Sequence, residues 1–146
     1  MVSVILHSLQ NLNIKEIHMK YYFSKKVDLD FDEAIEKVTK ELKEEGFGVL
    51  TEIDVKATLK KKLDVDFQNY QILGACNPGF AYKALQAENK IGTMLPCNVI
   101  VQELEDGSIE VSAIDPVASM QAVDNEQLPE VASEVRKKLS KVIESL

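Results

Sequence analysis

Two cysteines carry most of the chemistry that this sequence could perform, and each lies beside an asparagine and a proline. The two motifs are Cys76-Asn77-Pro78 and Pro96-Cys97-Asn98. Asn77 followed by Pro78 is typical of a helix start, because asparagine caps the first turn and proline lacks the N–H that would go unpaired there. Cys76 would then precede a helix N-terminus, whose free N–H groups and dipole stabilise a thiolate or a small anion.

Three functional interpretations of this cysteine region are open: a redox-active or persulfide-carrying thiol, a soft-metal site of two thiolates within one chain or across a dimer, or an anion site at the Asn77 cap. The structural alternative treats both cysteines as small buried apolar residues, because free cysteine is among the most frequently buried residue types. Asp115 could face a cleft, although an acid before proline is usually a turn residue. The candidate ligand-binding residues are Cys76, Asn77, Pro78, Cys97, Asn98 and Asp115.

The residue types that are scarce in the chain exclude several classes of site. Both histidines, His7 and His18, lie within the first 18 residues, so the rest of the chain offers no Ser-His or Cys-His nucleophile pair. Two cysteines cannot supply a four-ligand zinc site within one chain, and neither a P-loop nor a dinucleotide-binding motif is present. The sequence therefore identifies no catalytic residue, no metal site and no cofactor, and favours a domain that is not an enzyme.

Composition and charge limit the partners of the protein. Of the 146 residues, 45% are hydrophobic and 28% are charged, which is typical of a single globular domain. The formal net charge is −7 with Arg136 as the one arginine, whereas nucleic acids and anionic membranes require clustered positive charge. No apolar run could span a bilayer, and the N-terminus lacks a signal-peptide pattern. We therefore expect a cytoplasmic protein without a nucleic-acid or membrane partner.

The run that begins at Met19 is typical of a natural start, so we interpret residues 1–18 as a leader, either an alternative upstream start or an extra edge strand. Hydrophobic periodicity predicts a single α+β domain over residues 19–146. Asp30 and Glu33 fit a capping box at the start of the first helix, and Gly46 fits its end. The predicted strands are 20–27, 47–55, 70–76, 97–105 and 108–115, and the predicted helices are 31–45, 57–63, 78–88 and 129–146. The order strand, helix, four strands, helix, with a short helix inserted between the third and fourth strands, predicts an antiparallel sheet packed on two main helices.

Asp106-Gly107 is a strong turn signal and predicts a hairpin between the last two strands. A two-residue loop at this point would pair Leu104 with Ile109 and would place Leu104 and Ile100 on the face that the helices cover. The opposite face would carry the apolar residues distant from the turn, which are Cys97, Val99, Val101 and Ile114. Such a half-apolar face requires cover, either from residues 77–96 or from a partner subunit.

Several motifs together resemble the bacterial and archaeal family catalogued as domain of unknown function 302. They are GACNP, AYKAL, IGTMLPCNVIVQE and DGSIEVSAIDP, and the resemblance extends over nearly all of residues 19–146. It implies a TATA-binding-protein-like α+β fold and a homodimer, but no activity. The nucleic-acid role of that fold's namesake does not transfer, since fold does not imply function and the charge is negative. We expect either a homodimer with a small-molecule or thiol-based site at the two motifs, or an interaction module whose cysteines lie in the core or at the dimer seam.

Overall fold

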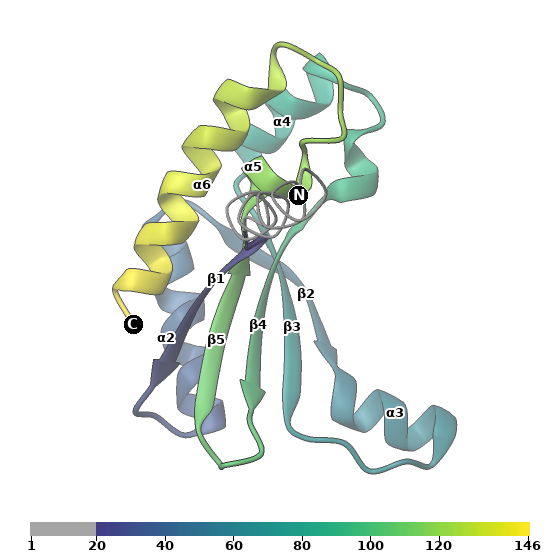
Figure 1. The fold of residues 1–146 in the computed structure, drawn as a ribbon, viewed down its shortest axis with the longest axis vertical. Helices are drawn as coiled ribbons and strands as arrows, with labels where there is room; N and C mark the ends of the chain where they lie inside the picture. Colours follow the sequence, from purple (N-terminus) through teal and green to yellow (C-terminus); the bar gives the residue numbers. More distant parts are fainter. Residues whose placement is uncertain (1–19) are drawn as a thin grey trace, which may run out of the picture.

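The computed structural model describes residues 20–146, so the predicted leader and its two histidines lie outside the described residues. The elements, in chain order, are β1 (Tyr22–Val27), α2 (Phe31–Glu44), β2 (Gly48–Asp54), α3 (Val55–Leu63), β3 (Tyr70–Cys76), α4 (Pro78–Ala87), the 3₁₀ helix η1 (Ile91–Met94), β4 (Cys97–Glu103), β5 (Ile109–Ile114), α5 (Pro116–Ser119) and α6 (Leu128–Glu144). The strands form one antiparallel sheet in the order β1-β5-β4-β3-β2 (Figure 1). The predicted α+β class and the predicted element order are confirmed.

Local sequence signals determine where α2 begins and ends. The Asp30 carboxylate accepts a hydrogen bond from the backbone N–H of Glu33 at 2.8 Å, as the capping pattern predicts. Gly46 follows the helix with a φ of 85°, in the left-handed region that favours glycine. The buried stripe of Ala34, Val38 and Leu42 packs against the sheet. α6 adds its own apolar stripe to the same core, so both main helices lie on one face of the sheet.

The two faces of the sheet therefore have different environments. Side chains that alternate toward α2 and α6 are 0–1% exposed, and these are Leu73, Ala75, Val99, Val101, Val111 and Ala113. The side chains between them point to the opposite face, which we call the open face and which carries Tyr22, Tyr70, Asn98, Ile100, Gln102, Glu110, Ser112 and Ile114. Neither of the two main helices covers the open face, and Figure 1 views the sheet from this side with α2 behind it.

The register of the β4–β5 hairpin differs by one residue from the predicted one. The N–H of Leu104 donates to the carbonyl of Ser108 at 2.8 Å, and the turn closes through Gly107 with a φ of 84°. The loop thus has three residues, and Val101 pairs with Val111. A shift of one residue moves every side chain to the other face.

The predicted faces of β4 were consequently wrong, whereas those of β5 were right, since Ile109, Val111 and Ala113 lie in the core and Ile114 lies on the open face. Cys97, Val99 and Val101 lie in the core, while Ile100 lies on the open face. The apolar surface that was expected to need cover at the cysteine end is covered by α6 and by residues of the 77–96 segment, among them Phe80.

The segment around α3 extends away from the helical layer (Figure 1). Its N-cap is Asp54, whose carboxylate accepts from the N–H of Ala57 at 2.9 Å. No residue of α3 is buried against the rest of residues 20–146. Five large apolar side chains on this segment and on β2 are exposed, and these are Leu50, Ile53, Leu63, Val65 and Phe67. We call this the arm surface.

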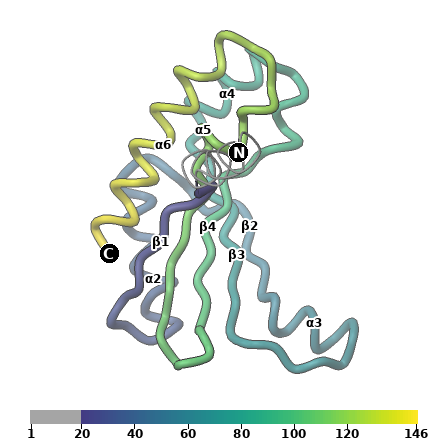
Figure 2. Tube along the Cα trace, in the orientation of Figure 1, coloured from purple at the N-terminus to yellow at the C-terminus, as the bar shows by residue number. Residues whose placement is uncertain are grey.

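At the opposite end of the sheet, α4, η1 and α5 gather next to the start of α6 (Figure 2). A second small core lies here, in which Ala84, Ile91 and Leu128 are buried. In the part of the chain that the structure describes, no helix is long and apolar enough to cross a membrane.

Candidate functional site

The two cysteines lie at the same end of the sheet, as predicted. Cys76 ends β3 and Cys97 begins β4, and the neighbouring residue Ala75 pairs with Cys97 across the two strands. Both side chains line a pocket of about 30 Å³ whose other walls are mostly apolar and include Phe47 and Phe80. Such a volume is close to that of one water molecule, and a water there would find few hydrogen-bond partners.

Burial determines the ionisation of Cys97. Its side chain is 8% exposed, and this desolvation, together with the charge of the nearby Cys76, raises the pKa of the Cys97 thiol to about 11. Cys97 is thus a neutral thiol at physiological pH, whereas thiol nucleophiles and metal ligands act as thiolates. Cys76 is half-buried. Among residues 20–146, no cluster of three or more His, Cys, Asp or Glu side chains could hold a metal ion.

Asn77 occupies the N-cap position of α4, but its side chain makes no capping bond. Instead, its Nδ2 donates to the backbone carbonyl of Glu45 at 3.3 Å, which joins the end of α2 to the beginning of α4. Gly46 lies directly under this contact, because a Cβ there would approach Asn77 Nδ2 to 3.1 Å. Pro78 is the first residue of α4 and is exposed. The side chain of Asn77 therefore binds the backbone that follows α2 and does not cap α4.

Asp115 is buried at the end of β5, and its side chain is 2% exposed. One carboxylate oxygen accepts the N–H of Val117 at 3.0 Å and caps α5, while the other lies 3.4 Å from Nε of Arg136 on α6. The Arg136 guanidinium also lies over the ring of Phe23, 5.8 Å from its centroid. Asp115 therefore links the sheet, α5 and α6, and both of its oxygens have partners.

The open face contains a groove of about 410 Å³, which we call the open-face groove. Its lining consists of Tyr21, Tyr22, Tyr70, Asn98, Ile100, Gln102, Glu110, Ser112, Ala113 and Ile114. This volume lies in the range of about 300–1,000 Å³ that is typical of small-molecule sites. A second hollow of about 260 Å³ shares Asn98 and Ile114 with the groove and extends toward Met94 and Ser119.

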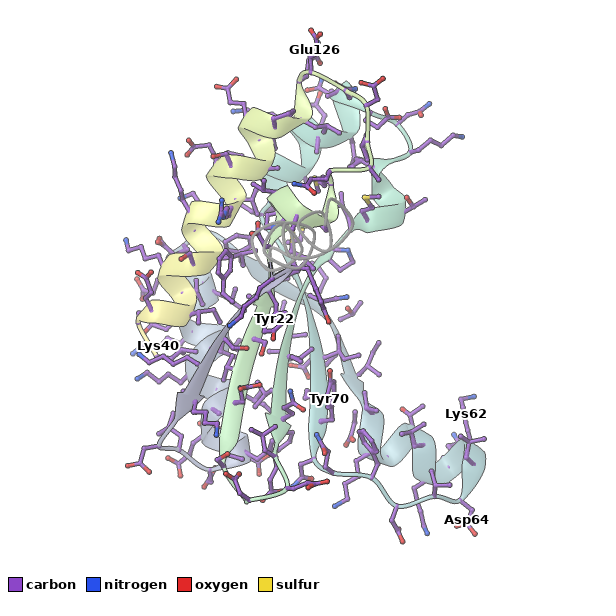
Figure 3. The ribbon with its side chains drawn as sticks, viewed as in Figure 1. Tyr22, Lys40, Lys62, Asp64, Tyr70 and Glu126 are labelled. Atoms are coloured by element: carbon purple, nitrogen blue, oxygen red, sulfur yellow. The ribbon has the colours of Figure 1, made fainter. Side chains whose placement is uncertain are left out.

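Tyrosine rings line both ends of the open-face groove. Tyr22 lies opposite Ile114 and Tyr70 lies opposite Gln102, and the rings of Tyr21 and Tyr22 meet edge to face at 5.0 Å. Figure 3 shows Tyr22 and Tyr70 on the same face of the sheet. Burial, with a smaller contribution from Tyr21, raises the pKa of Tyr70, so this phenol is protonated at neutral pH.

A chain of side-chain amides orients the one carboxylate of the groove. Gln68 Nε2 donates to Gln102 Oε1 at 2.9 Å, and Gln102 Nε2 donates to Glu110 Oε1 at 3.4 Å. Beside Glu110, the hydroxyl oxygens of Ser24 and Ser112 lie 2.7 Å apart. The groove thus combines aromatic surface with hydrogen-bonding groups whose positions are already set.

The structure divides the predicted site residues between the two faces of the sheet. Cys97 and Asn98 are consecutive residues of β4, so Cys97 points into the core and Asn98 points into the groove. Cys76 and Asn77 lie with Cys97 around the small apolar pocket, and Asp115 bonds α5 and α6. Five groove residues were not predicted from the sequence, and these are Tyr21, Tyr22, Gln102, Glu110 and Ser112. For Gln102, Glu110 and Ser112 the one signal is the alternation of polar residues along β4 and β5, which requires the correct register.

Comparison with known proteins finds one matching family model and a similar solved structure. The family model described as "Domain of unknown function DUF302" matches residues 23–146. Among solved structures, the chain is similar to an uncharacterized conserved DUF302 protein from Bacillus stearothermophilus, with 28% sequence identity and a TM-score of 0.81. That similarity covers 86% of this chain and 98% of the other. No curated protein matches the sequence significantly. All of the open-face groove except Tyr21 and Tyr22 lies within the residues that the family model matches.

Proposed function

The chain belongs to the DUF302 family, whose description names no activity, and we propose that it is a small-molecule-binding domain with its site in the open-face groove. The observation that carries the proposal is the composition of the groove. Three tyrosines and four polar side chains line a hollow of about 410 Å³. Tyrosine supplies a large apolar contact area and a hydroxyl that can pair with a polar ligand group. Of the residues predicted from the sequence, Asn98 belongs to this site.

A fragment screen on the native protein tests this function. The chain has four tyrosines and no tryptophan, so tyrosine fluorescence reports mainly on the groove, where three of the four lie. We expect fragments found by ligand-observed NMR to change this fluorescence and to bind at least tenfold more weakly to Tyr70→Ala. The matched control is Tyr82→Ala, because Tyr82 is exposed on α4 outside the groove. A screen without hits, or hits that bind Tyr70→Ala as they bind the wild type, would refute the proposal.

Self-association is a second function, supported by the arm surface. Leu50 and Leu63 are 67% and 65% exposed, and β2 is an edge strand of the sheet that pairs with β3 alone among the described strands. Exposed apolar groups beside an unpaired strand edge favour a two-fold contact in which β2 pairs with β2 of a second copy. This surface replaces the hairpin face as the basis for the expected homodimer.

Native mass spectrometry and light scattering distinguish the dimer from the monomer. We expect the wild-type chain to be dimeric and Leu63→Glu to be monomeric at micromolar concentrations. Leu85→Glu is the matched control, since Leu85 is an exposed leucine on α4 and lies outside the arm surface. A wild-type monomer, or a Leu63→Glu dimer as stable as the wild type, would contradict this second function.

The proposal assigns the two cysteines a structural role in packing. Cys97 is a buried neutral thiol, and the pocket between the cysteines has room for little more than one water. These observations support the structural alternative over a thiolate-based site.

A further inference from the structure

We infer that the ligand of the open-face groove is a small organic cation, an ammonium group carried on an apolar frame. This inference rests on the proposed function, because it specifies the chemical class that the same groove accepts. Glu110 is the one acidic side chain of the groove, and neither lysine nor arginine is among the described residues that line it.

The Glu110 carboxylate is available to a ligand and held in place. Its Oε1 accepts from Gln102 Nε2, and Gln102 is itself held by Gln68. Lys26 lies opposite Glu110 in the sheet register, yet its Nζ lies 4.0 Å from Asp106 Oδ2. Within residues 20–146, Glu110 has no ion-pair partner within 4.0 Å. An ammonium ligand would supply the missing positive charge.

The register also orients the ligand. Tyr70 lies opposite Gln102, which lies opposite Glu110, so these three residues form one row across β3, β4 and β5. Asn98, four residues earlier on β4, is roughly 13 Å away from Gln102 at the rise of an extended strand. The ammonium group would lie in the Tyr70 row, and the apolar frame would extend over Ile100 toward Tyr22.

The tyrosine rings of the groove and the net charge of the chain also favour a positively charged ligand. The faces of tyrosine rings attract cations, and this attraction strengthens when the cation is desolvated. The chain has a formal net charge of −7, which attracts cations and repels anions before contact. An anionic ligand would meet the Glu110 carboxylate and find no lysine or arginine among the described lining residues.

Three probes with one frame and different charge test the inference: 2-phenylethylamine, 2-phenylethanol and 3-phenylpropanoate. Their binding to the full chain is measured by amide chemical shifts and tyrosine fluorescence. We expect the amine to bind at least tenfold more tightly than the alcohol and the carboxylate not to bind. Glu110→Gln should weaken the amine about tenfold, equivalent to about 1.4 kcal/mol, and leave the alcohol unchanged. Glu103→Gln is the matched control. Glu103 follows Gln102 on β4, so its side chain points to the face opposite the groove, and the substitution removes the same charge there.

Each remaining result would overturn the inference. Equal affinities for the amine and the alcohol, or an equal loss from Glu103→Gln and Glu110→Gln, would show that the Glu110 carboxylate does not select a cation. If the alcohol or the carboxylate bound in the groove and the amine did not, the cation class would fail and the small-molecule site would stand. If no probe moved groove resonances and the fragment screen also gave no ligand, both would fail.

Discussion

Replacing Cys97 by alanine should make the stability of the protein less sensitive to alkaline pH. Burial raises the pKa of this thiol from an ordinary 9.0 to about 11 in the folded state. Because the folded pKa lies above the unfolded one, the stabilisation is fully present below pH 9.0 and is lost as the pH rises toward 11. Each pKa unit corresponds to about 1.4 kcal/mol, so the loss approaches about 3 kcal/mol at the end of this window.

Urea unfolding followed by circular dichroism, at pH 7 to 11 in a thiol-free reductant, measures this loss. The free energy of unfolding of the wild type should fall more steeply with pH than that of Cys97→Ala, and the two curves should diverge only above pH 9. Tyr70, whose pKa is also raised, is present in both proteins and cancels in the difference. Parallel curves would refute the buried-thiol reasoning, and a wild type that gains stability relative to the variant would indicate a native thiolate.

Three further predictions concern the residues around the two cysteines. In the native protein, a thiol reagent should modify Cys76 and leave Cys97 unmodified until urea is added; equal rates would contradict the burial of Cys97. Asp115→Ala should lower the free energy of unfolding by about 2–3 kcal/mol, since it removes the cap of α5 and the partner of Arg136. The matched control Asp124→Ala, at an exposed aspartate, should change it little. Equal effects of the two substitutions in thermal unfolding would contradict a stabilising role for the buried Asp115 contacts. Gly46→Ala should lower the free energy of unfolding by about 1–2 kcal/mol, because the φ of 85° at Gly46 disfavours a side chain. Gly48→Ala is the control and should leave it unchanged, since a Cβ at Gly48 would have no heavy atom within 4 Å. A Gly46→Ala variant as stable as the wild type would contradict this prediction.

Signals confined to a few neighbouring residues predicted the elements well. Asp30 and Gly46 define the ends of α2 because a cap and a left-handed glycine act within one turn. The register of the β4–β5 hairpin was predicted wrongly because it also depends on a local signal, and this signal is ambiguous. Asp106-Gly107 fits a two-residue loop and also a three-residue loop with Gly107 in the left-handed region, and the local sequence does not distinguish them. The choice reverses both faces of β4, and with them the expected positions of Cys97 and Asn98.

The open-face groove was beyond reach from the sequence because its residues meet only through the strand order. Tyr22 on β1 and Tyr70 on β3 line one groove because β5 and β4 lie between these two strands in the sheet and form the floor of the groove. No spacing in the chain encodes that order. The single domain over residues 19–146, the cytoplasmic location, the TATA-binding-protein-like relationship and the homodimer stay predictions.

The pairing of β1 with β5 has a kinetic consequence for the groove. Ser24 and Ser112, which bond across these strands, are separated by 88 residues, whereas β4 and β5 are joined by a tight hairpin. Contacts between distant residues carry a larger loop-closure cost and generally form late in folding. Tyr22 would therefore reach the groove only when the chain is nearly native. A ligand that needs both ends of the groove would bind the finished fold and not its intermediates, and would protect the protein by mass action.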